Sequence, residues 1–253
     1  MAMENIGFED RLNKLETKLD QLMALARYSA LGADRILSFI YNDHMIRLYL
    51  PFADVDKIQQ IILQHRSFFE TRFLAEVGAM IPANAVVIDA GANIGNHTVF
   101  FSKVLGAAEV WAFEVMRETY RILERNIELN DLKNVRPLNV GLGAREGRAN
   151  LSRFKLSNIG GTEVTVAEDG LYPIRAIDSF DIPKVDFIKI DVEGGQIDVL
   201  EGAKETLGRC KPLVWVEMRA PYGEVEPGTA KLESLGYTLK RQMTRSDFIF
   251  APR

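Results

Sequence analysis

The chain has 253 residues, 47% of them hydrophobic, which is enough for one well-packed domain with an appendage. Its 31 basic and 35 acidic residues give a net charge of −4, which argues against a nucleic-acid partner. A single cysteine, Cys210, excludes an internal disulfide, and neither a secretion signal nor an apolar run of roughly 20 residues is evident, so we expect a cytoplasmic protein without a transmembrane segment.

Residues 1–60 differ in kind from the rest and are predicted to form an N-terminal helical extension. Apolar residues recur there at alternating steps of four and three: Phe8, Leu12, Leu15, Leu19, Leu22 and Ala26. This spacing is typical of an amphipathic helix with a heptad-like seam. Because the run is shorter than three to four heptads, two interpretations stay open. Either the helix packs on its own domain, or residues 6–30 join copies of the chain into a homo-oligomer.

Residues 61–253 are predicted to form one α/β domain. Before its first core strand, a strand is expected at Met45–Leu50 and a largely helical stretch at Asp54–Met80. Strands are expected at 86–89, 109–113, 135–140, 186–190 and 213–216, and helices at 98–105, 117–130 and 196–207. Two short strands are expected at 150–154 and 162–167, and a closing hairpin at 237–243 and 248–250.

Strands that alternate with helices predict a mostly parallel, doubly wound sheet. Pro137 cannot donate a backbone hydrogen bond, so its strand is expected at a sheet edge. The closing hairpin is expected to add an antiparallel strand to one edge of the sheet.

The segment Val86–His97 is the most informative part of the sequence. A β-branched run, typical of a strand covered on both faces, ends at Asp89. Gly91 and Gly95 allow positive φ and close backbone approach, and Asn93 between them is among the few other residues that tolerate positive φ. A strand, a glycine-rich loop and a helix in this order predict a site for a nucleotide-like cofactor.

Acidic residues end four predicted strands, at the sheet edge where open α/β proteins bind ligands. They are Asp89, Glu114, Asp191 and Glu217. Glu114 lies 23 residues after Gly91 at the end of the next strand, from which a carboxylate accepts hydrogen bonds from ribose hydroxyls.

The loop departs from the dinucleotide-binding pattern, because Asn93 stands where a pyrophosphate requires the second glycine. Asp89 suits a cationic ligand. S-adenosylmethionine carries an ammonium, a sulfonium and a ribose but no phosphate, so these residues favour it over NAD. An NAD-dependent oxidoreductase is the first alternative function, and a non-catalytic assembly module built on the N-terminal helix is the second.

With these residues, the chain resembles the FkbM family of S-adenosylmethionine-dependent methyltransferases. The matching segments are Val87–Thr98, Ala112–Glu114, Asn126–Asn130, Phe187–Gly194 and Val199–Ala203. The resemblance implies the class I methyltransferase fold, which is Rossmann-like, with a doubly wound seven-stranded sheet that contains one antiparallel strand. It also implies methyl transfer to a hydroxyl of a sugar, a glycan or a natural-product small molecule.

The resemblance further assigns the cofactor site to these residues: Asp89, Gly91, Asn93, Gly95, Asn96, Thr98, Glu114, Val140, Gly141 and Asp191. In this set the glycine loop would surround the methionine part, Glu114 would hold the ribose, and Val140 and Gly141 would lie beside the adenine. The chain departs from the family pattern at Val115, where proline is common, and at Gln196, where glutamate is common.

Three residues are candidates for the base that assists an alcohol nucleophile. Asp191 ends a core strand beside the expected methyl group, Glu193 follows it, and His97 lies in the first helical turn after the glycine loop. Each is open to a second interpretation, in which it orients the acceptor, lines the pocket or caps the helix. Lys189 alternates with apolar residues of its strand and is predicted to pair with an acid inside the sheet.

Asp191 and Glu193 carry oxygen ligands of the kind that divalent cations prefer, but no third ligand is evident, so we predict no metal site. Two further segments each have two interpretations. Ser67–Glu70 either closes over the cofactor or packs on the sheet, and Ser157–Gly161 forms either a mobile rim for the acceptor or an ordinary turn.

Overall fold

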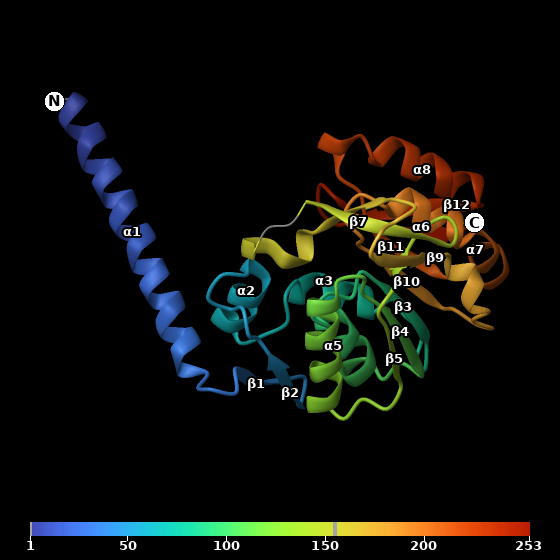
Figure 1. Ribbon diagram of the computed structural model, residues 1–253, viewed down its shortest axis with the longest axis horizontal. Coiled ribbons are helices and arrows are strands. Elements are labelled where there is room, and N and C mark those ends of the chain that lie inside the picture. Colours follow the sequence, from blue (N-terminus) through green and yellow to red (C-terminus); the bar gives the residue numbers. More distant parts are fainter. Residues whose placement is uncertain (1, 154–155) are drawn as a thin grey trace.

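The computed structural model describes residues 2–153 and 156–253, and the side chains of residues 9–152 and 157–253. Its centre is a seven-stranded sheet in the order β12-β13-β11-β10-β3-β4-β5 (Figure 1). The strands are β3 (Val86–Ala90), β4 (Glu109–Phe113), β5 (Val135–Leu138), β10 (Phe187–Ile190), β11 (Leu213–Glu217), β12 (Tyr237–Gln242) and β13 (Asp247–Pro252). β13 runs antiparallel to β11 and β12, whereas all other neighbouring strands of this sheet are parallel. The predicted seven-stranded sheet with one antiparallel strand is therefore confirmed.

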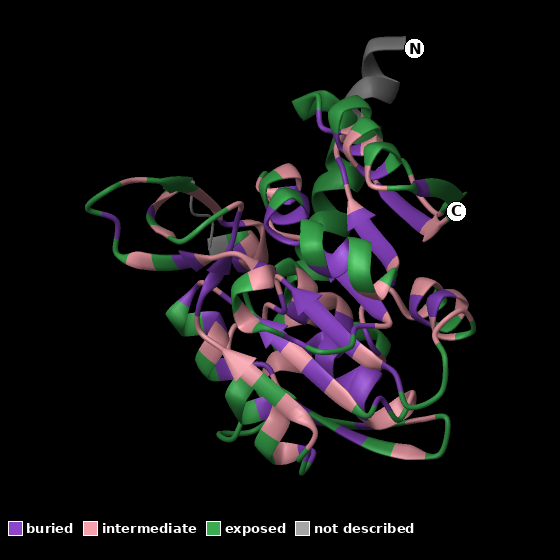
Figure 2. Cartoon of the chain, turned by 90° about the vertical axis from the view of Figure 1, so that its right-hand side faces the viewer, coloured by how far each residue is buried: buried purple, intermediate pink, exposed green. Residues whose placement is uncertain are grey.

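The sheet is covered by helices on both faces, and its central strands are buried (Figure 2). The helices are α2 (Lys57–His65), α3 (Thr71–Gly78), α4 (Asn96–Val99), the π-helix η1 (Phe100–Val104), α5 (Arg117–Leu129), α6 (Gln196–Gly202), α7 (Lys204–Cys210) and α8 (Val225–Ser234). On one face, Val87, Phe187 and Trp215 pack with α2, α3, α4, η1 and α5. On the other face, Ile188 and Val214 pack with α6, α7 and α8. These residues alternate along their strands, as a sheet buried on both sides requires.

The antiparallel strand is not at the sheet edge, where the sequence analysis placed it. β13 lies between β11 and β12, and β12 forms the edge. The composition of the two strands explains this order, because Phe248, Ile249 and Phe250 of β13 are all buried, whereas β12 is exposed after Tyr237. At the opposite edge lies β5, which carries Pro137 as predicted.

Two predicted helical stretches are interrupted. The stretch at 54–80 forms α2 and α3, separated by a turn in which Arg66 and Glu70 adopt left-handed φ angles of 47° and 58°. The stretch at 196–207 forms α6 and α7, which meet at Ala203, a residue with a non-helical φ of −110°. The hydrophobic pattern continues across both breaks, so it does not reveal them.

The region before the central sheet forms part of the same core. β1 (Ile36–Tyr41), which the sequence analysis missed, pairs antiparallel with β2 (His44–Tyr49). Asn126 of α5 accepts a hydrogen bond from the Tyr49 amide at 2.6 Å. The buried side chains of this hairpin pack in one cluster with those of the sheet. This packing therefore crosses the boundary that the sequence analysis placed at residue 60.

α1 (Ala2–Ala30) projects from this body as a long helix (Figure 1). Four leucines of the predicted seam are exposed, namely Leu12, Leu15, Leu19 and Leu22, whereas the side chain of Phe8 lies outside the described residues. Among the described helices, none is both long and apolar enough to cross a membrane.

A second, four-stranded sheet has the order β6-β9-β7-β8. Its strands are β6 (Gly141–Leu142), β7 (Gly147–Arg153), β8 (Glu163–Val166) and β9 (Tyr172–Arg175), and the 3-10 helix η2 (Leu156–Gly161) precedes β8. The two predicted short strands correspond to β7 and β8, although Phe154 lies outside the described residues. The short 3-10 helices η3 (Ile177–Phe180) and η4 (Ala220–Tyr222) complete the described elements.

Candidate active site

The glycine loop after β3 is shaped by a close contact with the end of β10. Gly91, Asn93 and Gly95 have φ angles of 81°, 49° and 87°, so the predicted positive φ of Asn93 is confirmed. A Cβ atom on Gly91 would lie 1.8 Å from the carbonyl oxygen of Asp191, a distance that no side chain permits. The loop therefore brings together two motifs that lie a hundred residues apart in the sequence.

Glu114 fixes the other side of this loop from the end of β4. Its Oε2 accepts a hydrogen bond from the Asn93 amide at 2.8 Å. Its Oε1 accepts from the Met116 amide and from the Thr119 hydroxyl, both at 2.8 Å. Burial raises the pKa of Glu114, and these hydrogen bonds oppose that rise. The carboxylate is thus held rigidly beside the loop, and Oε2 keeps a free lone pair for a ligand.

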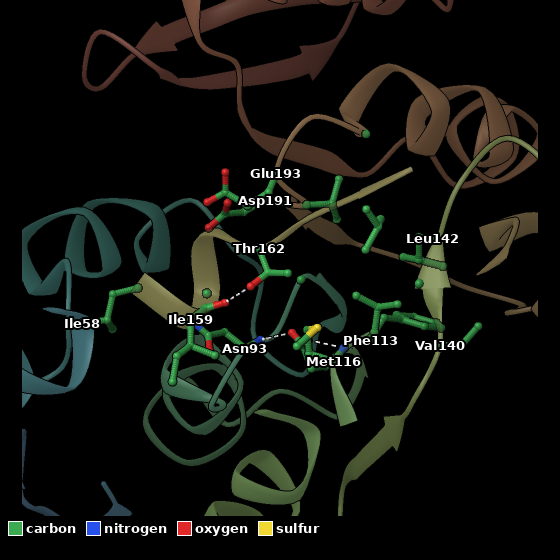
Figure 3. Close-up of a pocket in the computed structure, with 18 residues that line it drawn as sticks. Ile58, Asn93, Phe113, Met116, Val140, Leu142, Ile159, Thr162, Asp191 and Glu193 are labelled. Atoms are coloured by element: carbon green, nitrogen blue, oxygen red, sulfur yellow. Dashed lines mark hydrogen bonds between the residues drawn. The ribbon is translucent and has the colours of Figure 1, made fainter. Parts of the chain in front are cut away.

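The first pocket lies between the glycine loop, β6 and η2 (Figure 3). Six of the residues predicted to bind the cofactor line it, namely Gly91, Asn93, Glu114, Val140, Gly141 and Asp191. Phe113, Val140 and Leu142 form an apolar end, and Asp191 and Glu193 lie together at another end (Figure 3). None of the described residues that line this pocket is a lysine or an arginine.

The other four predicted cofactor residues do not line this pocket. The fully buried Asp89 accepts a hydrogen bond from the Thr98 hydroxyl at 2.6 Å. Asn96 is also buried and binds the backbone of Phe69, with its Oδ1 accepting from the Phe69 amide at 2.9 Å. A Cβ on Gly95 would approach the side chain of Leu123 to 2.7 Å. These four residues support the loop from within the protein.

A second pocket adjoins the first, and the two share Ile58, Asp191 and Glu193. Its walls come from α2, the turn before α3, and the carboxyl ends of β10 and β11. Phe69 and Trp215 supply aromatic surface, and Glu70 and Asp247 supply carboxyl groups. Ser67–Glu70 therefore contributes to a wall of the second pocket. It does not line the first pocket, and it does more than pack on the sheet.

A network of charged groups occupies the floor that the two pockets share. Lys189 donates a hydrogen bond to Asp191 at 3.0 Å, which confirms the predicted pairing of this buried lysine. Arg219 Nη1 lies 2.6 Å from Glu193 Oε2. Burial would raise the pKa of Asp191, but Lys189 and a hydrogen bond with Glu217 bring it below its usual value. Asp191 therefore carries a stable negative charge at neutral pH.

Glu217 is the acid of this network that carries a proton. Its burial and the adjacent Asp191 carboxylate raise the pKa of Glu217 to about 9. At neutral pH its carboxyl group is therefore neutral and donates the hydrogen bond that joins it to Asp191. The sequence predicts Glu217 at a strand end but assigns it no role, because only the parallel pairing of β10 with β11 brings it beside Asp191.

Asp191, Glu193 and Glu217 lie close enough that one carboxylate oxygen from each falls within 4.8 Å of the others. Glu217 is thus the third acid of this cluster, which the sequence did not group with Asp191 and Glu193. Lys189, Arg219 and the proton on Glu217 balance the charges of this cluster.

His97 lies beside the second pocket but is not one of its lining residues. Its Nε2 is 3.2 Å from Glu70 Oε2, and its ring packs edge-on against Trp215 at a centroid distance of 5.5 Å. The His97 side chain is buried, so it reaches the pocket through Glu70.

η2 covers the boundary between the two pockets. Asp56 caps α2 by accepting a hydrogen bond from the Gln59 amide at 3.0 Å, and it also accepts from the Ile159 amide of η2 at 2.9 Å. A Cβ on Gly160 would lie 2.1 Å from the side chain of Asn93. η2 thus forms part of the wall of both pockets, a position that agrees with the predicted rim rather than with an ordinary turn.

Comparison with known proteins identifies the family. Residues 89–239 match the Methyltransferase FkbM domain. This chain belongs to the FkbM methyltransferase family. The FkbM-family chain is also 28% identical over 203 residues to "Methyltransferase sdnD" of Sordaria araneosa, covering 64% of this chain and 77% of that protein. It is 30% identical over 141 residues to "Hexuronic acid methyltransferase AglP" of Haloferax volcanii, covering 53% of this chain and 56% of that protein.

A solved structure shows that the FkbM-family chain has the class I methyltransferase fold. The crystal structure of Methyltransferase FkbM from Methylobacillus flagellatus KT superposes with a TM-score of 0.55 at 16% sequence identity. The alignment covers 92% of this chain and 59% of that one. The similarity therefore extends well beyond the residues matched by the family domain.

Proposed function

We propose that this methyltransferase uses S-adenosylmethionine to methylate a hydroxyl of a sugar or of a related natural-product small molecule. The single observation that carries the proposal is the pair of adjoining pockets that share Asp191 and Glu193. One pocket suits the cofactor and the other suits the acceptor, and they meet where a methyl group would pass.

The residues of the first pocket fit S-adenosylmethionine. Glu114 Oε2 faces a position for ribose hydroxyls, and the apolar end at Val140 suits an adenine. The close approach at Gly91 leaves backbone in place of a side chain beside Asp191. The acidic residues and the absence of lysine and arginine from the described lining suit a cation and disfavour the pyrophosphate of NAD. When bound, this cofactor supplies an electrophilic methyl group.

The second pocket fits a ring with hydroxyl groups. Phe69 and Trp215 offer flat apolar surface, whereas the carboxyl groups of Glu70 and Asp247 can accept hydrogen bonds from hydroxyls. The resemblance to the hexuronic acid methyltransferase supports a sugar acceptor. The proposed partner is thus a small molecule that carries an alcohol.

We assign the proton-accepting role to Asp191. The acceptor hydroxyl donates a hydrogen bond to its carboxylate and is thereby aimed at the methyl group. With the cofactor bound, the bond between the methyl carbon and sulfur would break as the new C–O bond forms, leaving S-adenosylhomocysteine, and the hydroxyl proton, by then strongly acidic, would pass to Asp191. A carboxylate of low pKa is therefore sufficient as the base. Glu193 shares the junction of the pockets but is bound to Arg219, and His97 is assigned the positioning of Glu70.

The proposal is tested by incubating the protein with methyl-labelled S-adenosylmethionine and a panel of sugar and polyketide alcohols. The expected result is label in an O-methyl group of at least one product, identified by NMR. Label on nitrogen or carbon only, or hydride transfer from NADH to a carbonyl acceptor, would contradict the proposal.

A further inference from the structure

α1 presents an apolar stripe that nothing among the described residues covers. The side chains of Leu12, Leu15, Leu19 and Leu22 are 45%, 64%, 57% and 65% exposed. Their spacing assigns Leu12 and Leu19 to the a positions and Leu15 and Leu22 to the d positions of a heptad repeat. The stripe therefore has the pattern of a coiled-coil seam.

The side of α1 that faces the body of the protein is not this seam. A groove between α1 and α2 is lined by Asp20, Gln21, Ala24, Leu25 and Arg27. In the same heptad register these residues occupy positions b, c, f, g and b. The helix thus turns its other side toward α2 and leaves the leucines to solvent. Of the two interpretations of the sequence, the structure favours self-association.

We propose that α1 joins two copies of the chain into a parallel, two-stranded coiled coil. The charges beside the seam select this occupant and this orientation. Glu9 and Glu16 occupy e positions, and Arg11 and Lys18 occupy g positions. In a parallel pair a g residue meets the e residue five positions later in the other helix, so Arg11 meets the second copy's Glu16.

An antiparallel pair is disfavoured by the same charges. In that arrangement g positions face g positions and e positions face e positions, so Arg11 and Lys18 would meet basic residues and Glu16 would meet acidic ones. Toward the end of the helix, Met23 at an e position adds to the apolar surface and is 43% exposed. The charges at the e and g positions therefore favour pairing of α1 with the α1 helix of a second copy that runs in the same direction.

Light scattering on the full chain tests the association. We expect a mass of about 57 kDa, twice the 28.5 kDa of one chain. The double variant Leu15→Lys/Leu19→Lys should be a monomer with an unchanged thermal unfolding midpoint of the body. The matched control Thr17→Lys, at an f position on the opposite side of α1, should stay a dimer. A monomeric wild type, or a double variant that keeps the dimer mass, would overturn the proposal.

Crosslinking tests the orientation. Leu12→Cys is introduced together with Cys210→Ser, so that one thiol remains in each chain. In a parallel pair the two position-12 thiols face each other at an a layer, and mild oxidation should convert most of the protein into a disulfide-linked dimer. A dimer by light scattering that fails to crosslink would overturn the parallel arrangement.

Discussion

Gly91 and Asp191 are joined by a contact that leaves no room for a side chain. A Cβ atom on Gly91 would lie 1.8 Å from the Asp191 carbonyl oxygen. Gly91 begins the loop that shapes the first pocket, and Asp191 lies at the junction of both pockets. This contact therefore determines the position of Asp191 relative to the glycine loop.

Gly91→Ala is expected to weaken the binding of S-adenosylhomocysteine by at least tenfold and to lower the unfolding free energy. Gly106→Ala is the matched control, because Gly106 also has a positive φ, of 64°, but has open space around its Cβ position. The control should lose only the unfolding free energy that a left-handed alanine costs, about 1–2 kcal/mol. Calorimetric titration and urea unfolding measure the two effects, and equal losses in the two variants would show that the contact is unimportant.

Asp191→Asn is expected to leave the affinity for S-adenosylhomocysteine within about threefold of the wild type while reducing turnover by about 10²–10⁴-fold, the usual contribution of a general base. Asp198→Asn on α6 lies outside both pockets and serves as the control. The measurements are calorimetry and single-turnover methyl transfer. Full turnover in Asp191→Asn would show that Asp191 is not the base.

Glu217 is expected to make the stability of the protein depend on pH. Its pKa is about 9 in the folded state against 4.5 in the unfolded chain, so the folded state binds its proton more tightly. This contribution is complete below about pH 4.5 and is lost as the pH rises through 9. The melting temperature should therefore fall between pH 6 and 9, and less so in Glu217→Gln, which cannot ionise. Parallel melting curves for Glu217→Gln and the wild type across this range would refute the assignment.

Asp56→Ala is expected to loosen the wall that η2 forms. The substitution leaves the amides of Gln59 and Ile159 without their acceptor, at a cost of about 1–3 kcal/mol in unfolding free energy. Because Ile159 lines the first pocket, the affinity for S-adenosylhomocysteine should fall several-fold as well. Asp54→Ala, two residues away and exposed, should change neither quantity. An Asp56→Ala variant that loses stability but binds S-adenosylhomocysteine normally would show that η2 does not contribute to binding in the first pocket.

The sequence predicts those features that local patterns determine. The alternation of strands and helices, the positive φ of Asn93, the edge position of Pro137 and the buried pairing of Lys189 all follow from residue type and spacing. The sequence does not predict the position of β13 between β11 and β12, because the two strands of a hairpin can join a sheet in either order, and only the burial of Phe248 and its neighbours decides it.

The second pocket could not be predicted from the sequence, because its residues come from segments that only the fold brings together. Glu70, Trp215 and Asp247 lie on the turn before α3, on β11 and on β13. None belongs to a motif with a recognisable spacing. Glu217 is similar, since its raised pKa depends on a neighbour in the adjacent strand and not on its own sequence context.

Calorimetric titration of the protein with S-adenosylhomocysteine and, in parallel, with NADH measures directly whether the first pocket binds S-adenosylmethionine. We predict binding of S-adenosylhomocysteine in a 1:1 ratio per chain, at least tenfold weaker binding in Glu114→Gln, and unchanged binding in the exposed control Glu118→Gln. No binding of NADH is expected. Binding of NADH without binding of S-adenosylhomocysteine would contradict a site for S-adenosylmethionine in this pocket.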